Sequence, residues 1–174
     1  MAIRPQPGNS QVGRRMIWVA AIGLLVGLTV LFQFGTSQRS GIVQSSSDAG
    51  YSMVVLQRDR SGHYFAEGII NGQMVTFLID TGATDVALSE GVARALGLEF
   101  GPQVTVRTAA GPVRAWRARL ERVSIGEVSL DNVSATITRA PMAEVLLGMS
   151  FLKYFSLRQQ GEELIIESGT PPES

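Results

Sequence analysis

The longest apolar run of the chain covers residues 16–34 and reads MIWVAAIGLLVGLTVLFQF, without a charged side chain. A helix needs about 20 mainly apolar residues to cross a ~30 Å hydrocarbon layer. We therefore predict one transmembrane helix at residues 16–34. A cleaved signal peptide is the alternative interpretation, although the run is longer than the ~7–15 residues of a typical signal-peptide core.

The residues on either side of this run predict its orientation and its connection to the rest of the chain. Arg4, Arg14 and Arg15 precede it, whereas only Arg39 follows closely. Because cytoplasmic flanks carry the excess of Lys and Arg, residues 1–15 should lie in the cytoplasm and everything after the span outside. Residues 35–50, GTSQRSGIVQSSSDAG, are rich in Ser and Gly. Such a composition indicates a flexible tether.

From residue 51 onward the pattern changes to short strand-like runs separated by Gly, Asn and Pro. The predicted strands cover residues 53–58, 63–70, 74–79, 103–108, 113–123, 127–139 and 163–167. The Asn-Gly pair at 71–72 predicts a tight type I′ hairpin, because both residue types tolerate positive φ. The two strands around residues 109–112 predict a long hairpin whose tip projects.

A short soluble helix is expected at residues 89–96. Ser89 is a suitable N-cap residue, and Gly97 is a suitable residue to end the helix, although Gly91 weakens its interior. Together these patterns predict one all-β domain at residues 51–168, followed by a disordered tail at residues 169–174.

Composition removes several function classes. The 174 residues include 15 Lys and Arg, 15 Asp and Glu, one His and no Cys. A chain of zero net charge has no overall field to attract nucleic acid, so we predict no nucleic-acid partner. Without Cys there is no disulfide or thiolate zinc site, and a Ser-His-Asp triad would depend on His63 alone. We expect His63 to be an ordinary surface histidine, and we predict no metal and no cofactor.

The candidate chemistry lies where an apolar strand, residues 77–79, ends directly in Asp80-Thr81-Gly82. The end of a strand holds a carboxylate rigidly. Thr81 offers a hydroxyl to a hydrogen-bond network, and Gly82 allows the backbone to turn close to the acid because it has no Cβ. An ordinary turn closing a strand is the alternative, and the tripeptide alone does not distinguish the two.

Two hallmarks make the sequence resemble the aspartic proteases, specifically their retropepsin-like, single-lobe branch, over roughly residues 51–167. The first is Asp-Thr-Gly-Ala at residues 80–83. The second is Leu-Leu-Gly at residues 146–148, followed by a short helix, an element that in the family runs beside the catalytic loop. The hairpin around Gly111 stands where the family keeps its flap. The layout is similar to bacterial members that carry an N-terminal membrane anchor before a single catalytic lobe.

This resemblance implies a fold and a set of roles. The implied fold is all-β, a retropepsin-like single-lobe acid protease fold consisting of a closed β-barrel with a flap hairpin and one or two short helices, preceded by the transmembrane helix. The implied catalytic residues are Asp80, Thr81 and Gly82, and the implied substrate-binding residues are Ala83, Asp85 and Gly111. Thr84 replaces an acid that the family often has there, while Asp85 matches the second such position.

The chemistry of this family also implies a partner. Two carboxylates share a proton, one acting as general base toward water and the other as general acid toward the carbonyl. Because this chain has one Asp-Thr-Gly, a symmetric homodimer must supply Asp80 twice. The expectation is an aspartic endopeptidase acting on peptide or protein substrates, anchored in a bacterial inner membrane with its catalytic domain in the periplasm. The alternative is a non-catalytic peptide-binding or scaffolding module on the same fold.

Overall fold

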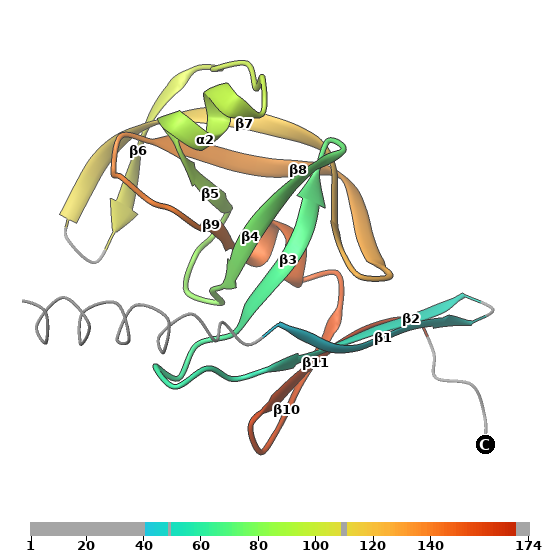
Figure 1. Cartoon of the computed structure of the whole chain (residues 1–174). Helices are drawn as coiled ribbons and strands as arrows, with labels where there is room; N and C mark the ends of the chain where they lie inside the picture. Colours follow the sequence, from blue (N-terminus) through green and yellow to red (C-terminus); the bar gives the residue numbers. More distant parts are fainter. Residues whose placement is uncertain (1–40, 49, 109–110, 170–174) are drawn as a thin grey trace, which may run out of the picture. The chain divides into compact units, whose positions relative to one another are not determined.

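The computed structural model describes residues 41–48, 50–108 and 111–169 (Figure 1). Within them the chain forms strands β1 Ile42–Asp48, β2 Tyr51–Gln57, β3 Phe65–Ile70, β4 Gln73–Ile79, β5 Val86–Ser89, β6 Gln103–Thr108, β7 Gly111–Ile125, β8 Val128–Thr138, β9 Val145–Leu147, β10 Ser156–Gln160 and β11 Glu163–Ser168. The helices are α2 Glu90–Ala95 and α3 Met149–Leu152. No helix among the described residues is long and apolar enough to cross a membrane, and the predicted span at residues 16–34 lies outside them.

Six strands close into a barrel in the order β3-β4-β9-β5-β8-β7, because β3 pairs with β4 on one side and with β7 on the other. β6 pairs with the outer part of β7, and the β6–β7 hairpin projects from the barrel (Figure 1). The predicted closed barrel with a flap-like hairpin and short helices is therefore confirmed.

The barrel closes where Ile69 and Ile70 of β3 pair with β7, directly after Gly68. A Cβ atom at this position would lie 2.4 Å from the Ser124 carbonyl oxygen and 2.7 Å from a ring atom of Phe77. Only a residue without a side chain allows β3 to approach β7 this closely. The inside is filled by large side chains that are completely buried, among them Phe77, Phe151 and Leu120. Each such side chain contributes roughly 1.5–3 kcal/mol by leaving water.

A second, four-stranded sheet has the order β1-β2-β11-β10. Val54 and Leu56 of β2 and Leu164 and Ile166 of β11 join the same buried core as the barrel side chains. β2 and β11 pair antiparallel, with Val54 opposite Ile166. The sheet therefore joins strands from the beginning and the end of the described chain.

Strand β1 corrects the predicted tether at residues 35–50. Residues 42–48 pair antiparallel with β2, and the Ser45 hydroxyl accepts a hydrogen bond of 2.9 Å from the Glu127 amide. The prediction was wrong for these residues because a polar edge strand gains its order mainly from backbone hydrogen bonds, which Ser-rich composition does not reveal. The folded domain thus begins before residue 51, while residues 35–40 and 170–174 lie outside the described part.

The predicted turn and helix ends are confirmed. Asn71 and Gly72 have φ angles of 49° and 82°, as a type I′ turn requires. The Ser89 hydroxyl caps α2 by accepting a hydrogen bond from the Val92 amide. Gly97, with a φ of 66°, follows the end of this helix.

Candidate active site

The loop at residues 80–85, here called the Asp80 loop, connects β4 to β5. The Asp80 amide donates to the Leu147 carbonyl at 3.1 Å, which continues the parallel pairing of β4 with β9. One carboxylate oxygen of Asp80, Oδ1, accepts a hydrogen bond of 2.9 Å from the Gly82 amide. Asp80 is half-buried, whereas Thr81 and Gly82 are exposed. Among the described residues the carboxylate has no other hydrogen bond and no ion pair, so it is available to react.

The second hallmark lies beside this loop, as predicted. The Met149 and Ser150 amides at the start of α3 donate to the carbonyls of Ala83 and Thr84, both at 2.8 Å. Gly148 permits this contact, because a Cβ there would lie 2.2 Å from the Asp85 carbonyl oxygen. Ser150 was not predicted from the sequence, since nothing in Met-Ser-Phe-Leu distinguishes it from an ordinary helix residue.

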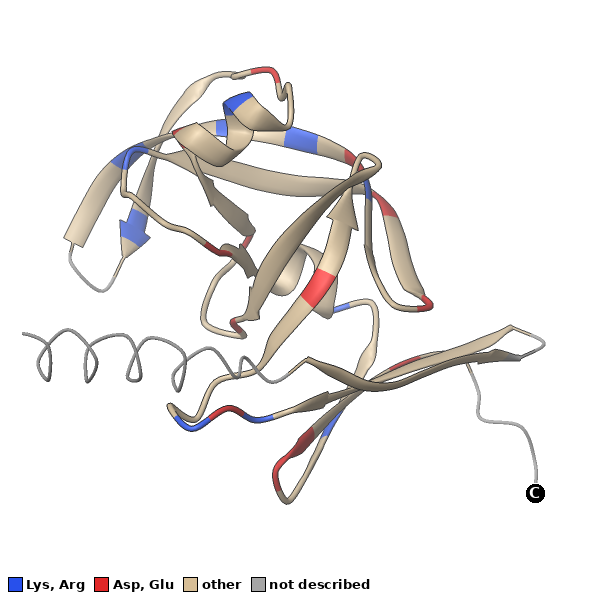
Figure 2. Cartoon of the chain, in the orientation of Figure 1, with Lys and Arg blue, Asp and Glu red and all other residues tan. Residues whose placement is uncertain are grey.

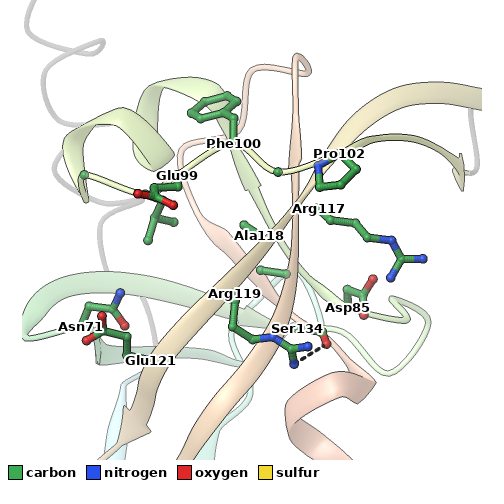
Figure 3. A pocket seen from close by; sticks show the side chains of 14 residues that line it. Asn71, Asp85, Glu99, Phe100, Pro102, Arg117, Ala118, Arg119, Glu121 and Ser134 are labelled. Carbon is green, nitrogen blue, oxygen red and sulfur yellow. Dashed lines mark hydrogen bonds between the residues drawn. The ribbon is translucent and has the colours of Figure 1, made fainter.

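Of the predicted substrate-binding residues, only Asp85 lines the cavity drawn in Figure 3. Asp85 is half-buried and lines a surface cavity of about 550 Å³ together with Arg117, Arg119 and Ser134 (Figure 3). Neither Asp80, Ala83 nor Gly111 is among the residues that line it. Gly111 instead begins β7 next to the hairpin tip, with a φ of 108°.

Charges of both signs line this cavity. Arg119 donates to the Ser134 hydroxyl and the Asn132 carbonyl, both at 3.1 Å. Glu99 and Glu121 are exposed toward the same cavity, and acidic and basic residues are interspersed over the rest of the domain (Figure 2). No single sign dominates, so this surface does not select an anionic ligand by its overall field.

A second polar cluster lies at the turn that precedes β3. The Ser61 hydroxyl lies 2.7 and 2.8 Å from the two carboxylate oxygens of Asp59 and 2.8 Å from Nδ1 of His63. A charge-relay triad needs the histidine between acid and serine, whereas here the serine lies between the other two. The cluster is thus a capped turn, and the expectation that His63 is an exposed surface residue is confirmed.

This turn adjoins the Asp80 loop, because the Ile79 amide donates to the Tyr64 carbonyl at 3.0 Å. Burial opposes ionisation of Asp59, but hydrogen bonds from the Ser61 hydroxyl and from the amides of His63 and Ser61 outweigh it and lower the pKa of Asp59. Elsewhere in the described residues, no group of three or more His, Asp or Glu side chains is arranged to hold a metal ion.

Comparisons with known proteins agree with this fold and show the family. The family model described as "gag-polyprotein putative aspartyl protease" matches residues 66–154, which include the Asp80 loop and Gly148. A crystal structure of a retropepsin-like aspartic protease from Rickettsia conorii matches with a TM-score of 0.58 and 28% identity, covering 72% of this chain and 94% of that one. The chain therefore belongs to the retropepsin-like aspartic protease family.

Two uncharacterized proteins are also similar. One, from the cobV 5′ region of a Sinorhizobium species, is 31% identical over 82% of this chain and 67% of its own length. The other, from Rickettsia prowazekii (strain Madrid E), is 29% identical over 65% of this chain and 50% of its own length. This chain thus spans about two thirds of the first relative and half of the second.

Proposed function

We propose that this protein is a membrane-anchored aspartic endopeptidase that works as a homodimer, with Asp80 as its catalytic carboxylate. The observation that carries the proposal is the setting of Asp80. It directly follows β4, whose last three residues are apolar and buried or half-buried, its amide is fixed by Leu147, and its carboxylate has no competing partner among the described residues. Family membership supports a protease function, and the single Asp-Thr-Gly of the sequence supports a shared site.

In the proposed reaction, Asp80 of one copy removes a proton from a water molecule while the protonated Asp80 of the other copy donates to the peptide carbonyl oxygen. The water oxygen bonds to the carbonyl carbon and gives a tetrahedral diol. The amide nitrogen then takes the proton that the first Asp80 removed from water, one hydroxyl of the diol returns a proton to the second Asp80, and the C–N bond breaks to release an amine and a carboxylic acid. Thr81 and Gly82 keep the loop in shape, and Ala83, Asp85 and Gly111 contact the substrate in this proposal.

A membrane anchor at residues 16–34, as predicted from the sequence, would favour pairing, because two domains held close to one surface meet at a high effective concentration. The excess of arginine before the span supports an inner-membrane protein of a bacterium with its catalytic domain in the periplasm. In spheroplasts, protease added from outside should then digest the domain that follows the span. Protection of that domain would reverse the orientation.

The decisive experiment compares the full chain with Asp80→Asn and with Asp131→Asn as a matched control. Asp131 is an exposed aspartate whose only ion pair in the described residues is with Arg122, so its loss should change little. Each protein is purified in mild detergent and incubated with a peptide library, with and without a statine-type inhibitor. Cleavage should disappear in Asp80→Asn and with the inhibitor, and should persist in Asp131→Asn.

Pairing is tested in the same assay. Specific activity should rise with protein concentration, and added Asp80→Asn chains should inhibit wild-type chains by forming mixed dimers with one functional carboxylate. Activity strictly proportional to enzyme over a wide dilution series would exclude the shared site. Peptides that bind but are never cut would instead indicate the non-catalytic binding module.

A further inference from the structure

The first turn of α3 makes three hydrogen bonds to the end of the Asp80 loop and to the start of β5. Two of its contacts come from the backbone, the Met149 and Ser150 amides described above. The third is made by the Ser150 side chain, whose hydroxyl oxygen accepts a hydrogen bond of 3.0 Å from the Val86 amide. Val86 is the first residue of β5 and is completely buried, so its amide has no access to bulk water.

The direction of the Ser150 hydroxyl is fixed by a second contact. Its single proton is donated to the Ser134 carbonyl at 2.7 Å, which leaves a lone pair for the Val86 amide. Ser134 lies inside β8, a strand that pairs with β5 on one side and β7 on the other. The hydroxyl therefore links the residue that follows the Asp80 loop to β8, a barrel strand that is paired on both sides.

We infer that Ser150 is a positioning residue for the proposed reaction. It holds residues 84–86 against β8 and thereby fixes where Asp80 stands relative to Asp80 of the second copy. This inference rests on the proposed function. Ser150 contacts Thr84 of the loop and Val86 at the start of β5 rather than Asp80, so it acts through the backbone and is not a catalytic residue.

The expected effect follows from the geometry of a shared proton. Removing the hydroxyl leaves the Val86 amide and the Ser134 carbonyl without this partner, and the loop must relax to find others. Two carboxylates that share a proton and a water tolerate little displacement, since a shift of ~1 Å can lower the rate of an enzyme ~10²-fold. We expect Ser150→Ala to lower kcat by at least ~10-fold while KM stays within about threefold.

The test uses full-length Ser150→Ala, with Ser150→Thr as the variant that keeps the hydroxyl. Ser129→Ala is the matched control, because Ser129 also lies on β8 and accepts a side-chain hydrogen bond of 2.7 Å, but from Arg122 and not from the Asp80 loop or β5. Thermal unfolding identifies a temperature at which every variant is folded, and kcat and KM are measured there. Ser150→Thr should recover most of the lost kcat, and Ser129→Ala should match the wild type.

Hydrogen–deuterium exchange provides a readout that does not depend on cleavage. The segment covering residues 80–86 should exchange faster in Ser150→Ala than in the wild type, and Ser150→Thr should restore its protection. Unchanged exchange, or an unchanged kcat in Ser150→Ala, overturns the inference. Cleavage by the wild type with an unaffected Ser150→Ala rejects this inference alone, whereas a wild-type chain that cleaves no peptide rejects the proposed function together with it.

Discussion

Replacing Gly148 by alanine tests how the Asp80 loop is held, because a methyl group at this position would overlap backbone atoms of the loop. Its Cβ would lie 2.2 Å from the Asp85 carbonyl oxygen and 2.6 Å from that of Ala83, where real Cβ atoms essentially never come within 3.0 Å. Gly148 has a φ of −93°, which any residue adopts, so the cost of Gly148→Ala is steric. Both obstacles are backbone atoms, and no rotamer change relieves them.

The magnitude follows from two contributions. Forcing an extra carbon into a packed site costs about 1–3 kcal/mol. Moving α3 away by roughly 1 Å also weakens its two backbone hydrogen bonds to the loop, at about 0.5–1.5 kcal/mol each. We expect Gly148→Ala to lower the free energy of unfolding by about 2–6 kcal/mol and to abolish cleavage.

Gly91 in α2 is the matched control, because a Cβ there would meet only the Ser89 hydroxyl, at 3.9 Å. Gly91→Ala should stabilise the protein by about 0.5–1 kcal/mol, the gain expected inside a helix. Both variants are compared with the wild type by urea unfolding followed by circular dichroism, at one protein concentration. A Gly148→Ala protein within about 1 kcal/mol of the wild type would refute the steric reasoning.

Three further predictions concern other parts of the domain. A fragment that begins at residue 51 lacks β1 and should unfold at lower urea concentration than one that begins at residue 41; equal midpoints would show that β1 adds no stability. Trp116→Ala should speed hydrogen exchange in the β6–β7 hairpin more than in the barrel. The reason is that the Trp116 ring packs 5.6 Å from the Phe100 ring and lies 5.2 Å under the Arg139 guanidinium. Equal acceleration of exchange in the hairpin and the barrel would contradict this. Asp59→Asn should destabilise the protein at neutral pH. Since the pKa of Asp59 in the folded state lies below its ordinary value of 3.8, the difference in stability from the wild type should fade as the pH falls through that lowered pKa. A difference that persists in strong acid would show that the charge of Asp59 is not responsible.

Local chemistry explains which elements could be predicted from the sequence. The Asn-Gly turn at 71–72 and the Ser89 cap depend on residue types with few alternatives, and both appear as expected. The position of Asp80 at a strand end followed from the apolar residues before it. In contrast, β1 and β10 are polar edge strands, IVQSSSD and SLRQQ, whose pairing is fixed by neighbouring strands rather than by their own pattern.

The contacts that fix the Asp80 loop could be predicted from the sequence only in part. Leu-Leu-Gly at 146–148 marked the segment that runs beside it, through the resemblance to a family rather than through any local pattern. Strand β9 is three residues long, too short for a periodic signal. The Ser150 bridge joins three segments that lie far apart in the sequence, and a hydroxyl that accepts from one backbone and donates to another leaves no trace in composition.

The pairing of β2 with β11 also determines when the proposed active site can form during synthesis. Val54 pairs with Ile166, more than a hundred residues later, and the Asp80 amide needs the Leu147 carbonyl. A growing chain that has exposed its Asp-Thr-Gly motif therefore still lacks the strands that fix it. Contacts over such separations form slowly, because the loops between them must close first. Under the proposed function, the nascent chain should therefore cleave no peptide until almost all of the described domain has left the ribosome.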